Sequence, residues 1–200
     1  MNGFDQLHDK YVHNRRVVKL SEHLTKLIPM GASLLDVGCG DGLIANLITK
    51  KRSDIKVNGV DVLIREKSYF PIDKFDGEHL PYPDKDFDVV MLVDVLHHTV
   101  DANILLSEAK RVARKYIILK DHTCNGFLAG PTLRFMDYVG NAKYGVNLPY
   151  NYWSKQQWHE SLDKLGVKID YWEQKLEMYP KPADYFFGRN LHFIAKLEIK

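Results

Sequence analysis

Three glycines at alternate positions follow a short apolar run near residue 35. In LLDVGCGDGL, Gly38, Gly40 and Gly42 separate a strand-like run from a helix-like one. Main chain without side chains lets a ligand approach closely, and the first N–H groups of the following helix can bind an anionic or polar group. Asp61 ends the next apolar run, about 20 residues further on, where a carboxylate can accept both ribose hydroxyls of a nucleoside. The spacing predicts a nucleoside-binding turn; a tight turn without a ligand is the alternative.

Titratable side chains follow two later apolar runs. His97 and His98 come after FDVVMLVDV, and Asp121 and His122 come after KYIIL. Imidazole and carboxylate groups act as general bases when they lie within hydrogen-bond reach of an acidic substrate proton. We predict His98, Asp121 and His122 as catalytic residues, with at most one of the two adjacent histidines facing the site. Purely structural hydrogen bonding is the alternative for each.

Alternating strands and helices are expected to position these residues. Apolar spacing of three and four predicts helices, and continuous apolar runs predict buried strands. Such alternation indicates a parallel sheet with helices on both faces, and a ligand site at the carboxyl ends of the strands. The expected helices are 12–28, 43–51 and 104–113, and the expected strands are 33–38, 55–62, 87–95 and 115–121.

The last third of the chain is rich in aromatic residues. Ser154 and Gln157 form a capping box that predicts a helix over 155–165, closed by Gly166. Two further strands are expected at 167–172 and 191–200, the second with unequal faces. In the segment before them, Leu133, Met136 and Tyr138 are predicted on the buried side of a helix, with Arg134 and Asp137 turned away.

Composition limits the classes of function. With 28 basic and 26 acidic side chains, the chain lacks the one-signed charge expected of a nucleic-acid or anionic-membrane partner. Two cysteines give no disulfide framework, and no apolar run approaches the ~20 residues of a membrane span, so a cytoplasmic protein is expected. Residues 1–200 are expected to form a single domain. The oligomeric state is not predicted.

Several motifs resemble those of one enzyme family. LLDVGCGDG resembles the first motif of class I S-adenosylmethionine-dependent methyltransferases, type 11 included, rather than the G-x-G-x-x-G of nicotinamide enzymes. GVDV at 59–62 resembles the acidic second motif, FDGEHLPYPDKDFDVV at 75–90 the third, and MLVDVLHH the fourth. The resemblance implies an α/β, Rossmann-like fold: a mostly parallel sheet of about seven strands, an antiparallel C-terminal strand, and helices on both faces. One departure is that no Pro-Gly-Gly turn precedes the expected fifth strand.

The resemblance implies S-adenosyl-L-methionine as cofactor and S-adenosyl-L-homocysteine as product. Asp36 would orient the ammonium group, Asp61 would hold the ribose, and Asp76 would accept from the adenine amino group. Residues 1–30 would form a helical lid, the alternative being an ordinary amphipathic helix. The implied cofactor-binding residues are Tyr11, Asp36, Gly38, Cys39, Gly40, Asp61, Val62, Asp76, Gly77 and Val93.

Residues 122–165 form an insertion that, in enzymes of this kind, builds the acceptor pocket. Its aromatic and amide side chains suit a small or medium organic molecule methylated at an oxygen or carbon centre. Alternatively, its aromatic residues only cover the edge of the sheet. The predicted substrate residues are Arg134, Asn141, Tyr144, Asn147, Tyr150 and Trp153.

Some residues also suggest other chemistries. Asp94 and Asp121 stand where catechol-type methyltransferases hold magnesium, but His122 replaces their third ligand, an Asn, so no metal is predicted. Thr123 and Cys124 resemble the nucleophile motif of RNA 5-methylcytosine enzymes, but the partner Pro-Cys is missing, so an ordinary thiol is expected. A non-catalytic cofactor-binding protein, an RNA methyltransferase and an NAD-dependent oxidoreductase are the alternatives.

Overall fold

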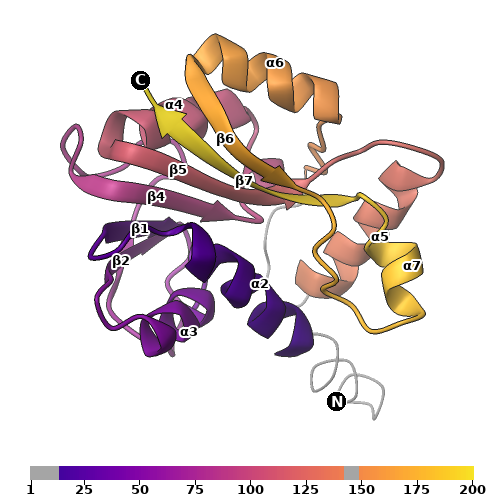
Figure 1. The fold of residues 1–200 in the computed structure, drawn as a ribbon, viewed down its shortest axis with the longest axis horizontal. Coiled ribbons are helices and arrows are strands. Elements are labelled where there is room, and N and C mark those ends of the chain that lie inside the picture. The colour runs from indigo at the N-terminus through magenta and orange to yellow at the C-terminus, as the bar shows by residue number, and fades with distance from the viewer. Residues whose placement is uncertain (1–13, 142–148) are drawn as a thin grey trace.

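The computed structural model describes residues 14–141 and 149–200, and these contain a seven-stranded sheet (Figure 1). The strand order is β3-β2-β1-β4-β5-β7-β6. The first five strands are parallel, and β7 runs antiparallel between β5 and β6. The strands are β1 Ser33–Val37, β2 Lys56–Asp61, β3 Ile72–Lys74, β4 Phe87–Val93, β5 Ala113–His122, β6 Val167–Glu173 and β7 His192–Ile199. The sheet expected from the resemblance is therefore confirmed.

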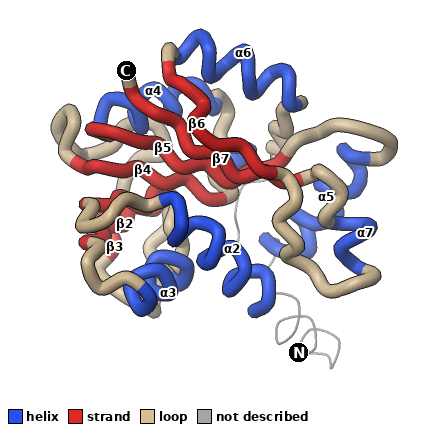
Figure 2. Tube along the Cα trace, in the orientation of Figure 1, coloured by secondary structure: helices blue, strands red, loops and turns tan. Residues whose placement is uncertain are grey.

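Helices cover both faces of the sheet, as the alternation predicted (Figure 2). The helices are α2 Asn14–Leu27, α3 Leu43–Lys51, α4 Ala102–Val112, α5 Ala129–Asn141, α6 Lys155–Leu165 and α7 Ala183–Phe187, with a 3-10 turn, η2, at Leu96–His98. In α6, Ser154 and Gln157 exchange both capping-box hydrogen bonds, and Gly166 closes the helix in the left-handed conformation. This confirms the helix predicted over 155–165. The helix predicted over 12–28 is confirmed for residues 14–27.

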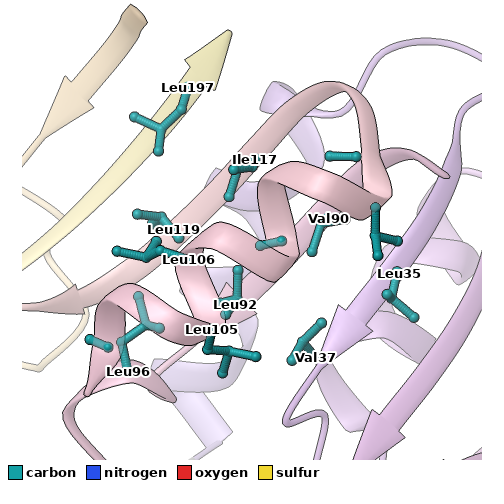
Figure 3. Packing of buried hydrophobic residues seen from close by; sticks show 14 of the residues in the cluster. Leu35, Val37, Val90, Leu92, Leu96, Leu105, Leu106, Ile117, Leu119 and Leu197 are labelled. Atoms are coloured by element: carbon teal, nitrogen blue, oxygen red, sulfur yellow. The ribbon is translucent and has the colours of Figure 1, made fainter. Parts of the chain in front are cut away.

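Neighbouring residues of the central strands enter different parts of the core. Leu35 packs under α4 and α6, whereas Leu34 packs on the other side with α2 and α3. Figure 3 shows Leu105 and Leu106 of α4 lying against the first of these sets. Because both sides of these strands are buried, their sequences are continuously apolar rather than alternating.

The closing strand β7 differs from expectation. Its sequence predicted unequal faces, yet Phe193 and Ile194 are both buried. The cause is its position between β5 and β6, where helices and the 176–179 segment cover both sides.

The carboxyl ends of β1, β2, β4 and β5 share one edge of the sheet, because these strands are parallel and in register. α5 and α7 lie beyond this edge (Figure 1). The glycine stretch, Asp94 and Asp121 are therefore brought together from distant parts of the chain. Among the described residues, no helix is both long and apolar enough to cross a bilayer.

Candidate functional site

The glycine turn after β1 is held against the end of β2. Gly38 donates its N–H to the carbonyl of Val60 at 2.8 Å, and Gly40 donates to Asp61 Oδ2 at 2.7 Å. Gly38 and Gly40 have φ of 67° and 64°, the left-handed region that favours glycine. A Cβ on Gly38 would lie 2.5 Å from Val95 Cγ2, so packing as well as conformation excludes a side chain there.

Two acids lie beside this turn. Asp36 is 3% exposed, and no group in the described parts of the chain donates a hydrogen bond to its carboxyl group. Burial, with the nearby Asp61 charge, raises the pKa of Asp36 to about 8. Asp61 accepts from Gly40 N–H and, through Oδ1, from Leu63 N–H at 2.9 Å. Asp61 is thus held by two hydrogen bonds, whereas the Asp36 carboxyl group has no hydrogen-bond donor among the described residues.

Two cavities open at this edge of the sheet. We call the first, of about 300 Å³, the histidine cavity; its walls include Gly40, Arg65, His98 and Met136. The second, of about 220 Å³, is the Asp76 cavity. Gly38 and His98 line both. The predicted cofactor residues Gly38, Cys39, Gly40 and Val93 line the histidine cavity, and Gly38, Val62, Asp76 and Gly77 line the Asp76 cavity.

The walls of the Asp76 cavity combine an acid with an apolar surface. Asp76 Oδ1 accepts from His79 N–H at 2.6 Å and from Glu78 N–H at 2.8 Å. These bonds, that of His79 first, lower the pKa of Asp76 to about 2, so the group is an acceptor at neutral pH. Val62 is 51% exposed, which leaves a flat apolar face available to a ring. Tyr11, the remaining predicted cofactor residue, lies outside the described residues.

Three histidines surround the inner end of the histidine cavity. His97, His98 and His122 all line it, so the expectation that only one of His97 and His98 would face the site is wrong. The two adjacent rings converge, with centroids 4.1 Å apart, because they project from the tight turn η2. Burial lowers the pKa of His98, and burial with the Lys120 charge lowers the pKa of His122 to about 4, so both are neutral at pH 7.

Asp121 reaches the cavity only through other side chains. It is 1% exposed; Oδ1 contacts His97 Nδ1 at 2.6 Å and accepts from His122 N–H, and Oδ2 accepts from Leu96 N–H. Burial opposes ionisation of both partners, but their mutual attraction raises the pKa of His97 to about 10 and lowers the pKa of Asp121. Of the predicted catalytic residues, His98 and His122 line the cavity and Asp121 does not.

A buried charge cluster lies beneath the histidines. Asp94, at the end of β4, binds Arg16 of α2 through Oδ2 and Lys120 of β5 through Oδ1. Lys120 Nζ also lies 3.3 Å from His192 Nδ1 on β7. These contacts hold the pKa of Asp94 well below its usual range in spite of burial. Both Asp94 oxygens are therefore engaged by cations, which argues against magnesium binding by Asp94 and Asp121.

The prediction for the faces of α5 is wrong at two residues. Asp137 is 6% exposed and faces inward, whereas Tyr138 is 61% exposed. Asp137 follows buried Leu133 by four residues and so shares its helical face. The buried carboxylate is compensated by Tyr152 Oη, which donates to Oδ2 at 2.8 Å, and by His97 and His98.

Three of the six predicted substrate residues have described side chains, and none of these three lines the histidine cavity. Trp153 packs on Trp158, with ring centroids 4.7 Å apart, and lines a separate cavity between α4 and α6. Arg134 lies over the ring of Tyr150 at 5.6 Å, and neither lines the histidine cavity. Trp153 is therefore a packing residue, since its apolar rings are buried against the core. The Asn141 side chain, Tyr144 and Asn147 lie outside what the structure describes.

Several site residues were not predicted from the sequence. Arg16, Lys120, Asp137, Tyr179 and His192 belong to the cavity wall or to the cluster behind it. One usable signal was Lys120 itself, a lysine that directly follows a buried apolar run and therefore needs a buried partner. Arg16 and Asp137 carried no such signal, because each looks like the polar side of an amphipathic helix.

Comparison with known proteins shows similarity to one family over part of the chain. Residues 35–118 match the family model described as a methyltransferase domain. The 27-O-demethylrifamycin SV methyltransferase of Amycolatopsis mediterranei is 31% identical over 48% of this chain and 40% of its own length. Ajmaline N-methyltransferase of Rauvolfia serpentina is 24% identical over 84% of this chain and 59% of its own. The chain thus spans about half the length of these curated relatives.

One solved structure is similar to this chain over its whole length. The PH0226 protein of Pyrococcus horikoshii superimposes with a TM-score of 0.68 at 18% identity and covers 100% of both chains, which shows a shared fold. Residues 35–118 are therefore similar to this methyltransferase domain family, and the whole chain shares the fold of the PH0226 protein. The cofactor of this family is S-adenosylmethionine.

The described residues of this protein fit that cofactor. Asp36 is a buried carboxyl group without a donor, as required to receive an ammonium group. Gly38 of the glycine turn lines both cavities. One cavity has an apolar wall and an acid, Asp76, and the other is lined by the histidines. Arg65 Nη2 would lie 3.1 Å from a Cβ on Gly40, which places a cation beside the turn.

Proposed function

We propose that this protein transfers the methyl group of S-adenosylmethionine to an oxygen or carbon centre of a small or medium organic acceptor. The observation that carries the proposal is the pair of cavities that share Gly38 in their walls, with Asp36 and Asp61 beside the turn and the neutral rings of His98 and His122 in the wall of the histidine cavity. The bound cofactor would supply an electrophilic methyl group, so the protein needs to supply alignment and a dry pocket.

Each end of the cofactor has a proposed set of contacts. Val62 and the Gly77 main chain would pack on the adenine ring, and Asp76 would accept from its amino group. Asp61, held by Gly40 N–H, would accept from the ribose hydroxyls. At the other end, Asp36 would pair with the ammonium group, and Arg65 would pair with the carboxylate.

The acceptor would enter the histidine cavity. His98 and His122 are proposed to contact it, because both line the cavity. Asp121 is proposed as a positioning residue, since it holds the rings of His97 and His122 and is itself buried. The lid role of residues 1–30 remains a prediction; Arg16 and Val17 of α2 line the cavity and are consistent with it.

Binding and turnover experiments test the proposal in that order. Isothermal titration calorimetry with S-adenosylhomocysteine is expected to show one site per chain, and NAD is expected not to bind. Methyl-labelled S-adenosylmethionine is then incubated with a panel of hydroxylated and carbon-acid metabolites, and S-adenosylhomocysteine is measured by mass spectrometry. Tight product binding without turnover on any acceptor would instead support a non-catalytic cofactor-binding protein. Binding of NAD but not of S-adenosylhomocysteine would overturn the assignment.

A further inference from the structure

Three potential metal-ligand atoms converge at the inner wall of the histidine cavity. His97 Nε2 and His98 Nε2 lie 3.6 Å and 3.7 Å from the same oxygen, Oδ1 of Asp137. Each of the three residues offers a ligand atom, and these ligand atoms lie within 4.8 Å of one another. The two separations are long for N–H···O hydrogen bonds, but they approach the ligand–ligand spacing of about 3.3 Å around a tetrahedral ion with bonds of about 2.0–2.1 Å. Two of the three separations are therefore close to those between the ligands of one metal ion.

Other side chains orient two of these groups. His97 Nδ1 is bonded to Asp121 Oδ1 at 2.6 Å, which directs the opposite nitrogen, Nε2, toward Asp137. Asp137 uses Oδ2 to accept from Tyr152 Oη at 2.8 Å, which leaves Oδ1 directed at the two imidazoles. Metal-binding histidines and carboxylates characteristically have outer partners of this kind, which hold the ring and the carboxylate in orientation.

A neighbouring group of acids and histidines is a poorer site. Asp94, His97, Asp121 and His122 are also close together, but the Asp94 oxygens are engaged by Arg16 and Lys120. A cation placed there would compete with an ammonium and a guanidinium that are already buried.

We propose that His97 Nε2, His98 Nε2 and Asp137 Oδ1 bind a divalent transition-metal ion such as Zn²⁺ whose remaining position faces the histidine cavity, and that the ion displaces the Nε2 proton of His97 to solvent. Two imidazoles and one carboxylate suit Zn²⁺, Co²⁺ or Fe²⁺ better than Mg²⁺ or Ca²⁺, which prefer oxygen ligands. Three protein ligands and one open position are typical of a catalytic rather than a structural site.

The role of this ion rests on the proposed function. An acceptor hydroxyl bound at the open position would lose its proton to solvent more readily, because the cation stabilises the oxyanion. That oxygen would then form the new O–CH₃ bond while the S–CH₃ bond of the cofactor breaks, which releases S-adenosylhomocysteine. The metal site thus favours an oxygen acceptor over a carbon one.

Direct metal binding tests the site without turnover. Tag-free protein is stripped with a chelator and titrated with Co²⁺, and the ligand-field absorption of the bound ion is recorded in the visible range. One equivalent per chain is expected, and an excess of Mg²⁺ is expected not to displace it. H98Q and D137N are expected to weaken Co²⁺ binding by at least about 100-fold, and Y152F, which removes only an outer partner, by about 10-fold.

Controls separate loss of the site from loss of the fold. H159Q alters an exposed histidine on α6 and is expected to bind Co²⁺ like the wild type. S-adenosylhomocysteine binding, measured on every variant, reports an intact fold. Substoichiometric Co²⁺ binding would overturn the metal site. So would an affinity of H98Q and D137N for Co²⁺ equal to that of the wild type. If Co²⁺ fails to bind while S-adenosylhomocysteine binds, the metal proposal fails alone; if only Co²⁺ binds, the methyltransferase proposal and the ion's catalytic role fail.

Discussion

Asp61 is the side chain that joins the glycine turn to the end of β2. Its Oδ2 accepts from Gly40 N–H, and we propose that the ionised carboxylate also accepts from the ribose. D61N retains an oxygen for Gly40 but removes the charge and one acceptor. Hydrogen bonds to charged groups contribute about 1.5–3 kcal/mol, so S-adenosylhomocysteine affinity is expected to fall about 10- to 100-fold. Calorimetry measures this loss.

D73N is the control for D61N. Asp73 lies on the adjacent strand β3 and bonds to Tyr82 Oη rather than to the glycine turn. Its substitution is expected to leave cofactor affinity unchanged. Equal affinities of D61N and the wild type would remove Asp61 from the ribose site.

Asp36 makes the stability of the cofactor-free protein depend on pH. Its pKa in the folded protein, about 8, is above the ordinary aspartate value of about 3.9, so the folded state binds more protons between pH 4 and 8. The contribution of Asp36 to stability therefore falls as pH rises through this interval. Asn cannot ionise, so the stability of D36N relative to the wild type is expected to increase with pH, by at most about 1.4 kcal/mol per pH unit. Urea unfolding of both proteins at pH 5.5, 7 and 8.5 measures the difference; a constant difference would contradict a raised pKa.

At the scale of single elements, α6 owes its start to a local cap. Ser154 accepts from Gln157 N–H, and the Gln157 side chain accepts from Ser154 N–H. S154A removes the first of these bonds and is expected to lower the free energy of unfolding by about 1 kcal/mol. S53A, at an exposed loop position, is expected to change it by less than about 0.5 kcal/mol. Urea denaturation compares the two variants, and equal stabilities would show that the cap does not stabilise the fold.

The same helix supports the site from behind. Trp158 of α6 donates its indole N–H to the carbonyl of His122 at 2.8 Å, so α6 holds the last residue of β5. On the other side, α5 contributes Asp137 to the cavity, and η2 contributes His97 and His98. No single element carries the site, since each supplies one or two groups to a common point.

At the scale of the whole molecule, the buried charge cluster connects α2, β4, β5 and β7. Lys120 is fully buried and pairs with Asp94, which also binds Arg16. K120M leaves the Asp94 carboxylate in the interior with one cation, and breaking a buried pair in this way costs about 3–5 kcal/mol. We expect a loss of that size in the free energy of unfolding. K115M is the matched control, because Lys115 lies on the same strand, pairs with Asp88 and is more than half exposed. Its expected cost is below about 1 kcal/mol, and similar stabilities of K120M and K115M would contradict the role of the cluster.

The order of strands and helices and the glycine turn were predictable because their signals are local. Apolar spacing, Gly38, Gly40 and the Ser154–Gln157 pair act over a few residues, and short-range geometry decides their conformation. The expected burial pattern failed where tertiary neighbours decide it: β7 is covered on both faces, and Asp137 rather than Tyr138 faces inward on α5.

The sequence by itself determined the class of fold and the place of the glycine turn, since strand ends in a parallel sheet converge whatever their loops contain. Only the tertiary structure decided which polar groups surround the acceptor. Asp137 meets His97 and His98 across about forty residues of chain, and Asp94 meets both Arg16 and Lys120. Such pairings depend on how α2 and α5 pack on the sheet, and a single buried acid on an amphipathic helix leaves no periodic signal of its partner.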